Sequence, residues 1–326
     1  MKSDAGGRRR RGWLFTVTPI VVVVLAAVAG IAVLVHNTRR DAAASPTAFH
    51  ASATTAARTT TTTPSTTTPT PSPTPTVSDN PALATAAVNA VDGLGIKGVT
   101  FGIAILDRNT GQVTAGQNAS SQFYSASVIK LFTVTYLLHE QELGALTLSP
   151  TMRNNITRAL ELSDDNAMDA FWGTYGGVKL IPEFVALYGL QNTAAPAIAG
   201  QWGETKFSPS DVLKVYDYVF TKLSSADSAL IIGDLAQAAD RGADGFDQAF
   251  GLLQPPRMPT VKAKQGWMQI GGNSLTLNTT GVLGSKNQYV IAILSRQPIS
   301  VSYATGRGYV NEAATAVVKA LTPGIS

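Results

Sequence analysis

The feature that most constrains the fold is an almost wholly apolar segment between Val128 and Leu138. On a helix its apolar residues point in every direction rather than along one stripe, so the sequence predicts a helix that is buried on all sides. Such a helix requires a domain large enough to pack other elements around it. Ser127 and Lys130 lie at its start, three positions apart, and therefore share one face within one turn.

The pairing of Ser127 with Lys130 could support nucleophilic catalysis. Burial makes a charged lysine costly and lowers its pKa, and a partly deprotonated amine one turn from a serine can activate the hydroxyl as a nucleophile. In the first turn, the backbone N–H of Ser127 also lacks a helical partner and suits half of an oxyanion hole. The alternative is structural: Ser127 caps the helix and Lys130 extends to water.

A long apolar segment near the N-terminus predicts a membrane anchor. Residues 1–12 form a basic tail with an arginine run, and residues 13–36 carry no charge between Trp13 and Val35. As a helix this uncharged part would be about 34 Å long, enough to cross a bilayer, and the arginines favour a cytoplasmic tail. Cleavage near the small residues of 41–45 is the alternative. We expect a single-pass signal anchor in the cell membrane, with the rest of the chain extracytoplasmic.

Residues 37–80 form a Thr/Pro-rich linker. Between Ala51 and Val77 there are 13 threonines, five prolines and a single charge, Arg58. Such a segment buries too little apolar surface to offset its ordering entropy, and its prolines keep it extended. We expect a disordered stalk that ends where residues 81–326 begin one folded domain.

Composition disfavours several kinds of site. Of the net charge of +4, residues 1–80 supply eight Lys/Arg against three acidic residues, so the domain is near neutral and nothing indicates a nucleic-acid partner. The chain has no cysteine, which excludes disulfides, thiolate metal sites and lipid attachment through cysteine. His139 is the only histidine after residue 80, which disfavours a Ser-His-Asp triad and a histidine zinc site. We expect no metal and no cofactor.

The order of the predicted elements indicates an α+β domain. Two strands, a helical block, three strands and a terminal helix predict a five-stranded antiparallel sheet, flanked by the N- and C-terminal helices, with a helical subdomain inserted. The expected strands are 99–106, 112–116, 260–270, 274–282 and 288–294. The expected helices are 82–91, 128–138, 152–162, 166–172, 177–187, 210–223, 226–239 and 308–321.

Three short motifs occur in order along residues 81–326. Ser127-x-x-Lys130 opens the buried helix, Ser163-Asp-Asp165 joins two helices, and Lys264-Gln-Gly266 lies on a strand. In this order and placement they resemble the Ser-x-x-Lys, Ser-Asp-Asn and Lys-Thr-Gly motifs of the penicillin-recognising serine enzymes, namely class A β-lactamases and D,D-peptidases. The resemblance spans the domain and implies a β-lactamase-like fold.

The resemblance implies a catalytic role for four residues. Ser127 would be the acylated nucleophile, and Lys130 the base that activates it. Ser163 would pass a proton to the leaving nitrogen. Lys264 would set the electrostatics of the site and help to hold a substrate carboxylate.

Four further positions would bind substrate or the oxyanion. The N–H of Trp267 would pair with that of Ser127, and Gly266 would let substrate lie along the strand. Two positions depart from the family pattern. Asp165 stands where the family has Asn, so either a carboxylate replaces an amide or the loop shifts by one residue to Asn166. Gln265 replaces a threonine hydroxyl, and its amide could still donate a hydrogen bond.

A third departure concerns deacylation. Class A β-lactamases carry a glutamate between the second and third motifs that activates the hydrolytic water, whereas residues 184–203 contain no Asp or Glu. Loss of a positioned general base costs about 10² to 10⁴ in the step that it serves. The sequence therefore predicts acylation without fast β-lactam turnover.

Together these features predict a membrane-tethered extracytoplasmic acyl-serine hydrolase that attacks a peptidoglycan-peptide amide or a β-lactam. One alternative is a true β-lactamase that activates water in another way. The other is a degenerate, non-catalytic module that binds cell wall or a protein partner, which Asp165 and Gln265 favour.

Overall fold

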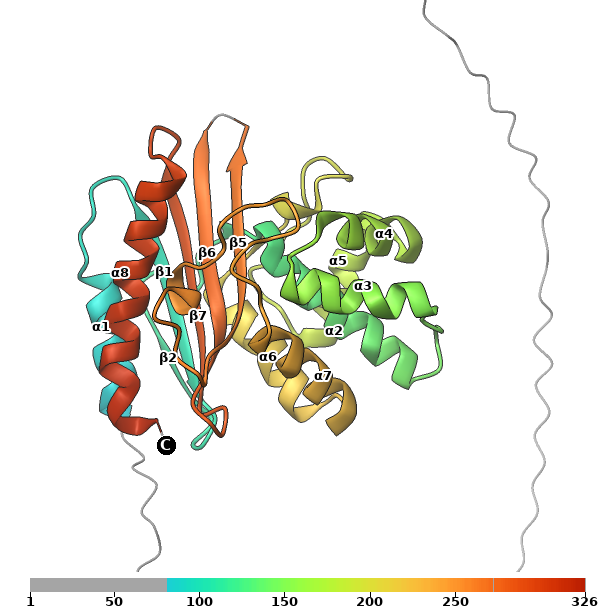
Figure 1. Ribbon diagram of the computed structural model, residues 1–326, viewed down its shortest axis with the longest axis horizontal. Coiled ribbons are helices and arrows are strands. Elements are labelled where there is room, and N and C mark those ends of the chain that lie inside the picture. The colour runs from blue at the N-terminus through green and yellow to red at the C-terminus, as the bar shows by residue number, and fades with distance from the viewer. Residues whose placement is uncertain (1–80, 272, 326) are drawn as a thin grey trace, which may run out of the picture. The chain divides into compact units, whose positions relative to one another are not determined.

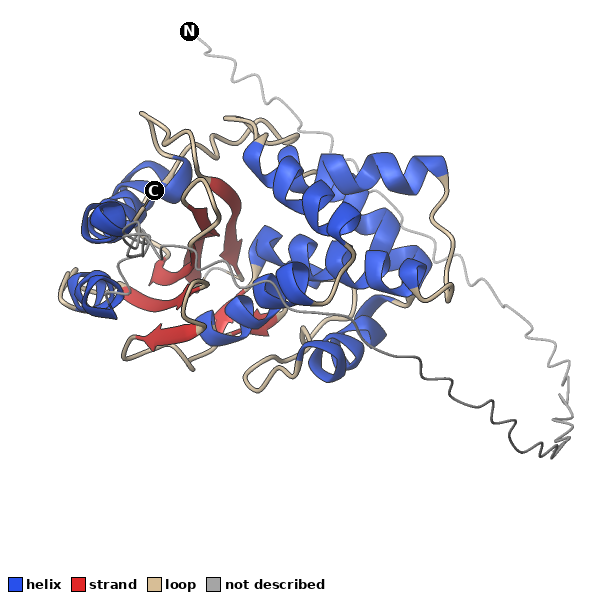
Figure 2. Cartoon of the chain, turned by 90° about the horizontal axis from the view of Figure 1, so that it is seen from below, coloured by secondary structure: helices blue, strands red, loops and turns tan. Residues whose placement is uncertain are grey.

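The computed structural model describes residues 81–271 and 273–325. The expected basic tail, anchor and linker, residues 1–80, lie outside these residues. Within the described residues, no helix combines the length and the apolar character needed to cross a membrane. The described part is an antiparallel sheet with helices on both faces, as Figures 1 and 2 show.

The sheet combines strands from the two ends of the domain. Its order is β2-β1-β7-β6-β5, and all neighbours are antiparallel, which confirms the predicted five-stranded sheet. The early hairpin reaches the late strands through the pairing of β1 with β7, where Ile103 faces Ile293. The strands are β1 Thr100–Asp107, β2 Gln112–Ala115, β5 Lys262–Ile270, β6 Ser274–Leu283 and β7 Tyr289–Pro298.

Each face of the sheet has its own hydrophobic core. Helices α1 and α8 cover one face, and the inserted helical subdomain covers the other (Figure 1). Strand β6 is buried along its whole length because both faces are covered. The helices are α1 Pro81–Asp92, α2 Ile129–Glu142, α3 Pro150–Glu161, α4 Asp165–Tyr175, α5 Leu180–Tyr188, α6 Pro209–Thr221, α7 Ser225–Ala236 and α8 Tyr303–Leu321.

Helix α2 is buried on all sides, as its composition predicts. Every residue from Ile129 to Thr135 is buried, including Lys130. The start of the helix differs from the expectation, because a 3₁₀ turn, η1 (Ala126–Val128), precedes α2 and carries Ser127. Ala126 has φ of +44°, a left-handed conformation that breaks the regular helix just before the serine.

A two-stranded ribbon that the sequence patterns missed leads into η1. Strands β3 (Phe123–Tyr124) and β4 (Lys206–Phe207) are two residues each, too short to give an alternating pattern. After the ribbon, Ser125 N–H donates to Thr205 O at 2.7 Å. The ribbon therefore fixes the chain immediately before Ser127.

Helix α8 begins earlier than expected. The expected start was residue 308, but the helix begins at Tyr303. A Cβ at Gly306 would lie 2.6 Å from Gln297 Oε1 and 2.8 Å from Leu277 Cδ1, so this glycine serves close packing on the sheet.

Candidate active site

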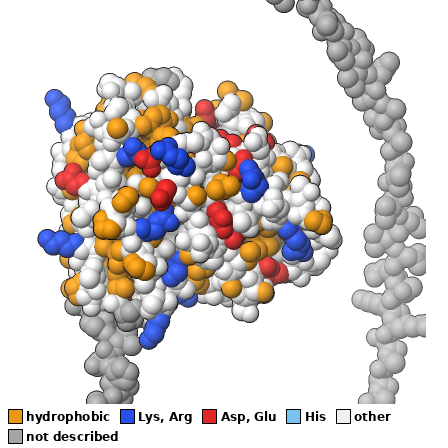
Figure 3. Space-filling model, in the orientation of Figure 1, with side chains coloured by type: hydrophobic (Ala, Val, Ile, Leu, Met, Phe, Trp, Pro, Cys, Tyr) orange, Lys and Arg blue, Asp and Glu red, His pale blue; other side chains and the backbone are white. Residues whose placement is uncertain are grey.

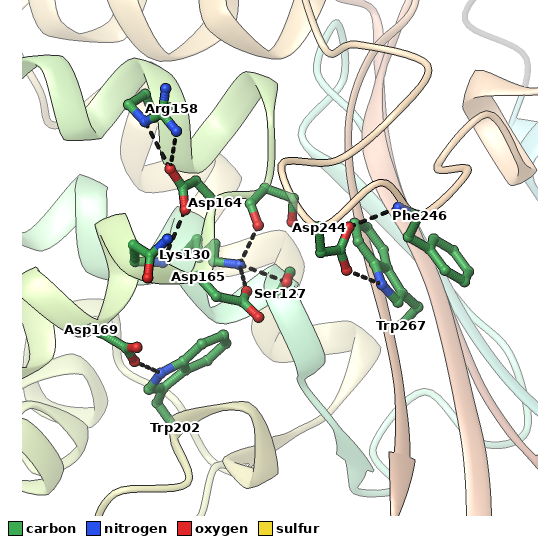
Figure 4. Close-up of polar contacts among 12 residues, drawn as sticks. Ser127, Lys130, Arg158, Asp164, Asp165, Asp169, Trp202, Asp244, Phe246 and Trp267 are labelled. Atoms are coloured by element: carbon green, nitrogen blue, oxygen red, sulfur yellow. Dashed lines mark hydrogen bonds and ion pairs between the residues drawn. The ribbon is translucent and has the colours of Figure 1, made fainter.

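Ser127 and Lys130 meet at the junction of η1 and α2. Lys130 Nζ lies 2.7 Å from Ser127 Oγ, and both side chains are buried (Figure 4). The pair therefore shares one face of the turn, as the three-residue spacing predicts. Lys130 does not extend to water, which rules out the structural alternative for this lysine.

The amine of Lys130 has three hydrogen-bond acceptors. Besides Ser127, Nζ donates to Ser163 O at 2.7 Å and to Asp165 Oδ1 at 2.6 Å. These acceptors match the three N–H bonds of an ammonium group. Burial lowers the pKa of Lys130, and the negative charge of Asp165 opposes that shift. Burial thus favours the neutral amine that a general base needs, and Asp165 favours the charged form that follows proton transfer.

Ser163 and Lys264 close the site from the opposite side. Lys264 Nζ donates to Ser163 Oγ at 2.7 Å and to Gln265 O at 3.0 Å. Burial, reinforced by the positive charge of Lys130, holds the pKa of Lys264 well below its usual value. A continuous set of polar contacts thus joins the three motifs inside the domain.

The turn between α3 and α4 is shaped to present Ser163. Its φ of +52° is left-handed, a conformation that costs about 1–3 kcal/mol in a non-glycine residue. The buried Asp164 stabilises the turn because it accepts from Asn166 N–H at 2.9 Å and from Arg158 Nε at 2.7 Å. Backbone strain held in this way is typical of functional sites.

Asp165, rather than Asn166, contacts the lysine. The Asp165 side chain is 62% exposed, yet it reaches Lys130 Nζ, whereas the side chain of Asn166 is exposed and has no hydrogen bond among the described residues. This resolves the two sequence alternatives in favour of a carboxylate in place of the amide, without a shift of the loop.

Gln265 does not enter the cleft, contrary to the expectation that its amide could meet substrate. The side chain is buried, and Nε2 donates to Phe250 O in the core beneath α8. Lys264 and Gln265 are adjacent on β5 and therefore point to opposite faces of the sheet. Because Lys264 faces Ser163, Gln265 must face away.

The space beside Gly266 is occupied by η1. A Cβ at this position would lie 2.9 Å from Ser125 O and 3.2 Å from Ser127 N. The glycine thus permits close approach of β5 to the turn that holds the nucleophile. The glycine therefore has a packing role in addition to the room for substrate that the resemblance implies.

Strand alternation places the N–H of Trp267 at the free edge of β5. Strand β5 is at the edge of the sheet, and Gln265 O faces away from β6 because it accepts from Lys264 Nζ. Backbone groups alternate along an antiparallel strand, so Trp267, two residues on, presents its N–H at the same free edge. This edge adjoins η1, where Ser127 lies.

A cavity of about 360 Å³ opens in front of Ser127. Several of its lining residues were not identified from the sequence: Asp169, Trp202, Asp244 and Met268. Asp169 lies four residues after Asp165, so helical spacing alone could have indicated it. The other three come from the loops at 200–203 and 240–250 and from the end of β5, for which no local pattern gave a signal.

Two indoles anchor carboxylates at the rim of the cavity. Trp202 Nε1 donates to Asp169 Oδ1 at 2.7 Å, and Trp267 Nε1 donates to Asp244 Oδ2 at 3.2 Å (Figure 4). The segment 184–203 contributes Gly200 to Gly203 to the wall and supplies no carboxylate.

His139 has a structural place outside the cavity. It lies in the last turn of α2, and one of its ring nitrogens is 3.0 Å from Tyr218 OH. The histidine is therefore no partner of Ser127.

Comparisons with known proteins identify the family of the chain. A family model described as "Beta-lactamase enzyme family" matches residues 84–154, which include Ser127 and Lys130. The "Putative lipoprotein LppW" of Mycobacterium tuberculosis (strain ATCC 25618 / H37Rv) is 36% identical over 234 residues, 71% of this chain and 73% of that protein.

Solved structures share the fold at low identity. A class A β-lactamase from Bacteroides cellulosilyticus DSM 14838 has a TM-score of 0.61 at 15% identity, covering 74% of this chain and 99% of its own. The structure of PBP-A has a TM-score of 0.57 at 15% identity, covering 74% and 97%. These likenesses confirm the predicted fold class. The relative that covers 71% of the chain and the family match over residues 84–154 show that the chain belongs to the β-lactamase enzyme family, within the penicillin-recognising serine enzymes.

Proposed function

We propose that this protein is an extracytoplasmic acyl-serine hydrolase that attacks an amide or ester carbonyl through Ser127, such as that of a peptidoglycan peptide or a β-lactam. The observation that carries the proposal is the set of short contacts from Ser127 Oγ through Lys130 to Ser163 and Lys264, beside a cavity of about 360 Å³. This volume lies in the usual range of small-molecule sites.

Acylation uses the residues in a defined sequence. The neutral amine of Lys130 accepts the proton of Ser127 Oγ as the oxygen attacks the carbonyl carbon. The N–H groups of Ser127 and Trp267 stabilise the oxyanion that forms. Collapse breaks the bond to the leaving group, which receives its proton through Ser163, and Lys264 keeps that hydroxyl oriented.

Deacylation is the slow step in this proposal. Water must attack the acyl-serine, and the wall formed by residues 200–203 holds no carboxylate that could activate it. Asp165 is engaged by Lys130, and Asp169 by an indole N–H. An acyl-enzyme that persists for hours is therefore expected.

Membrane attachment through residues 13–36 is part of the proposal. The mycobacterial relative is named a lipoprotein, but this chain has no cysteine to carry a thioether-linked lipid. Attachment by its own apolar segment would place the domain on the same side of the membrane as a cell-wall substrate.

Labelling of the full chain tests the proposal. A neutral fluorophosphonate and a fluorescent penicillin are incubated with wild type, Ser127→Ala and the matched control Ser121→Ala, whose serine is exposed on a loop. We expect the fluorophosphonate to label wild type and the control but not Ser127→Ala, and any penicillin adduct to survive for hours. Rapid release of penicillin with turnover would indicate a true β-lactamase.

A non-catalytic binding module is the second candidate, because Gln265 has left the cleft. Absence of labelling by both probes, in a protein whose thermal unfolding is cooperative, would favour this candidate and contradict the enzymatic one.

A further inference from the structure

We infer that the cavity in front of Ser127 selects a cationic substrate: an amide or ester that carries an ammonium group, held between the carboxylates of Asp169 and Asp244. This inference rests on the proposed function and specifies its substrate class. It differs from the expectation for a β-lactam or a peptide C-terminus, since both carry a carboxylate.

The first argument is the charge of the wall. The charged side chains that line the cavity are Asp165, Asp169 and Asp244, and no described lining residue is a lysine or arginine. Elsewhere on the domain, basic and acidic side chains are interspersed, as Figure 3 shows for one face. A cavity of one sign of charge concentrates ligands of the opposite sign.

The second argument is that two of these carboxylates have no cation in direct contact within the described part of the chain. Asp165 pairs with Lys130, whereas Asp169 accepts from the neutral indole of Trp202. Asp244 accepts from the indole of Trp267 and from Phe246 N–H at 2.9 Å. Neither forms an ion pair among the described residues. Both carboxylates are therefore within reach of an ammonium group in the cavity.

The third argument is the position and surroundings of these carboxylates. Asp169 lies on one side of Ser127 and Asp244 on the other (Figure 4). Each is held by the edge of a tryptophan, and the partly exposed rings of Trp202 and Trp267 contribute to the wall. Aromatic faces next to carboxylates suit an organic cation, because both attract positive charge.

The fourth argument is that the means to bind a carboxylate are missing. Gln265 points into the core, and β6, the neighbour of β5, contains no lysine or arginine. Strand β5 itself carries two lysines. Lys262 does not line the cavity and donates to Gly284 O, and Lys264 is buried and donates to Ser163 and Gln265 O. An anionic substrate would therefore face three aspartates without a free cation.

A metal ion is a poorer occupant than an organic cation. Within the described residues, no group of three acidic or histidine side chains is close enough together to hold a metal. The carboxylates are spread across a cavity rather than gathered around one point, which fits a ligand of several atoms.

Three esters with the same straight acyl chain and a cationic, neutral or anionic end test the inference: the p-nitrophenyl esters of ε-aminocaproate, caproate and adipate. We expect the second-order rate constant of acylation of wild type, measured from the burst of p-nitrophenolate, to decrease in that order, and the preference to weaken as salt is raised. Asp169→Asn and Asp244→Asn keep an acceptor for each indole but remove the charge. Each should lower the ratio of the ammonium to the neutral ester by about threefold to tenfold. Glu312→Gln, on the exposed side of α8, is the matched charge control and should leave this ratio unchanged.

Failure of the inference and failure of the proposed function give different results. If the neutral ester acylates Ser127 but the adipate ester reacts as fast as the ammonium ester, cation selection is wrong and the enzyme remains. If no ester reacts, tryptophan fluorescence of Ser127→Ala is titrated with cadaverine and with glutarate. Saturable binding of cadaverine alone, lost in the Asp169→Asn, Asp244→Asn double variant, would support the cation site without catalysis. Binding of glutarate, or of neither compound, would overturn it.

Discussion

The two walls of the cleft match the serine-acylating motifs to different degrees. On the helical wall, formed by η1, α2 and the α3–α4 turn, Ser127, Lys130 and Ser163 are joined by hydrogen bonds of 2.7 Å. On the strand wall, formed by β5, Lys264 contacts Ser163, but the side chain of Gln265 points into the core. Groups that make and break bonds must stay in contact, whereas groups that only recognise substrate can diverge separately.

The two buried lysines show the same division. Lys130 has a carboxylate partner, while the acceptors of Lys264 Nζ, Ser163 Oγ and Gln265 O, are neutral. Burial lowers the pKa of both amines; the charge of Asp165 opposes this shift at Lys130, and the charge of Lys130 lowers the pKa of Lys264 further. Lys130, on the helical wall, can therefore hold the proton that Ser127 releases, while Lys264 orients the hydroxyl of Ser163.

The largest expected effect is that of Lys130→Ala. Without the amine, labelling of Ser127 by fluorophosphonate should slow by about 10² to 10⁴, the usual worth of a general base. The fold should survive, because Asp165 is 62% exposed and can return to water. Lys179→Ala, at an exposed lysine, is the control. Labelling at the wild-type rate in a folded Lys130→Ala protein would remove this lysine as the base.

Gly266→Ala tests whether the strand wall positions the helical wall. The added Cβ would press on Ser125 O and Ser127 N, so we expect labelling to slow by tenfold or more and the free energy of unfolding to fall by about 1–3 kcal/mol. Gly233→Ala in α7 meets nothing within 4 Å and should instead be neutral or stabilising. Unchanged labelling in Gly266→Ala would show that the two walls are independent. Chemical denaturation and labelling kinetics measure both effects.

Asp165→Asn should move the pH dependence of acylation. The base form of Lys130 is the neutral amine, so the rate rises with pH through the pKa of Lys130. The charge of Asp165 raises that pKa, and its removal should lower it, which shifts the rising limb of the pH profile to lower pH. The measurement is the fluorophosphonate labelling rate against pH. A shift to higher pH, or none, would contradict the assignment of Lys130 as the titrating group.

The sequence predicted those parts of the molecule that depend on residues close together along the chain. The all-round apolar pattern of α2 predicted its burial, and short apolar segments between turn residues predicted the strands. The three-residue spacing correctly placed Ser127 and Lys130 on one face. These features depend on neighbours along the chain, which a sequence shows directly.

The features that the sequence did not predict depend on contacts between distant segments. Ser125 is fixed by Thr205 and Gly203, and Asp244 reaches the cavity because its loop docks on the α3–α4 turn, where Ala243 N–H donates to Leu162 O at 2.8 Å. The direction of Gln265 followed from strand alternation and could have been derived, because Lys264 must face Ser163. The motif comparison obscured that point by treating Gln265 as a replacement for a substrate-binding residue.

The smallest expected effect, Gln265→Thr, tests how deeply the strand wall has diverged. Threonine restores the third motif of the family, yet its side chain would take the direction of Gln265, away from the cleft. The Phe250 carbonyl would lose its donor in a buried place, so the free energy of unfolding should fall by about 1–3 kcal/mol. Gln269→Thr, at an exposed position of the same strand, is the control and should cost little. Reactivity toward the adipate ester should not rise, because the three aspartates of the cavity remain. An increase in that reactivity above wild type would show that the loss of one threonine, rather than the negative charge of the cavity, excludes anionic substrates.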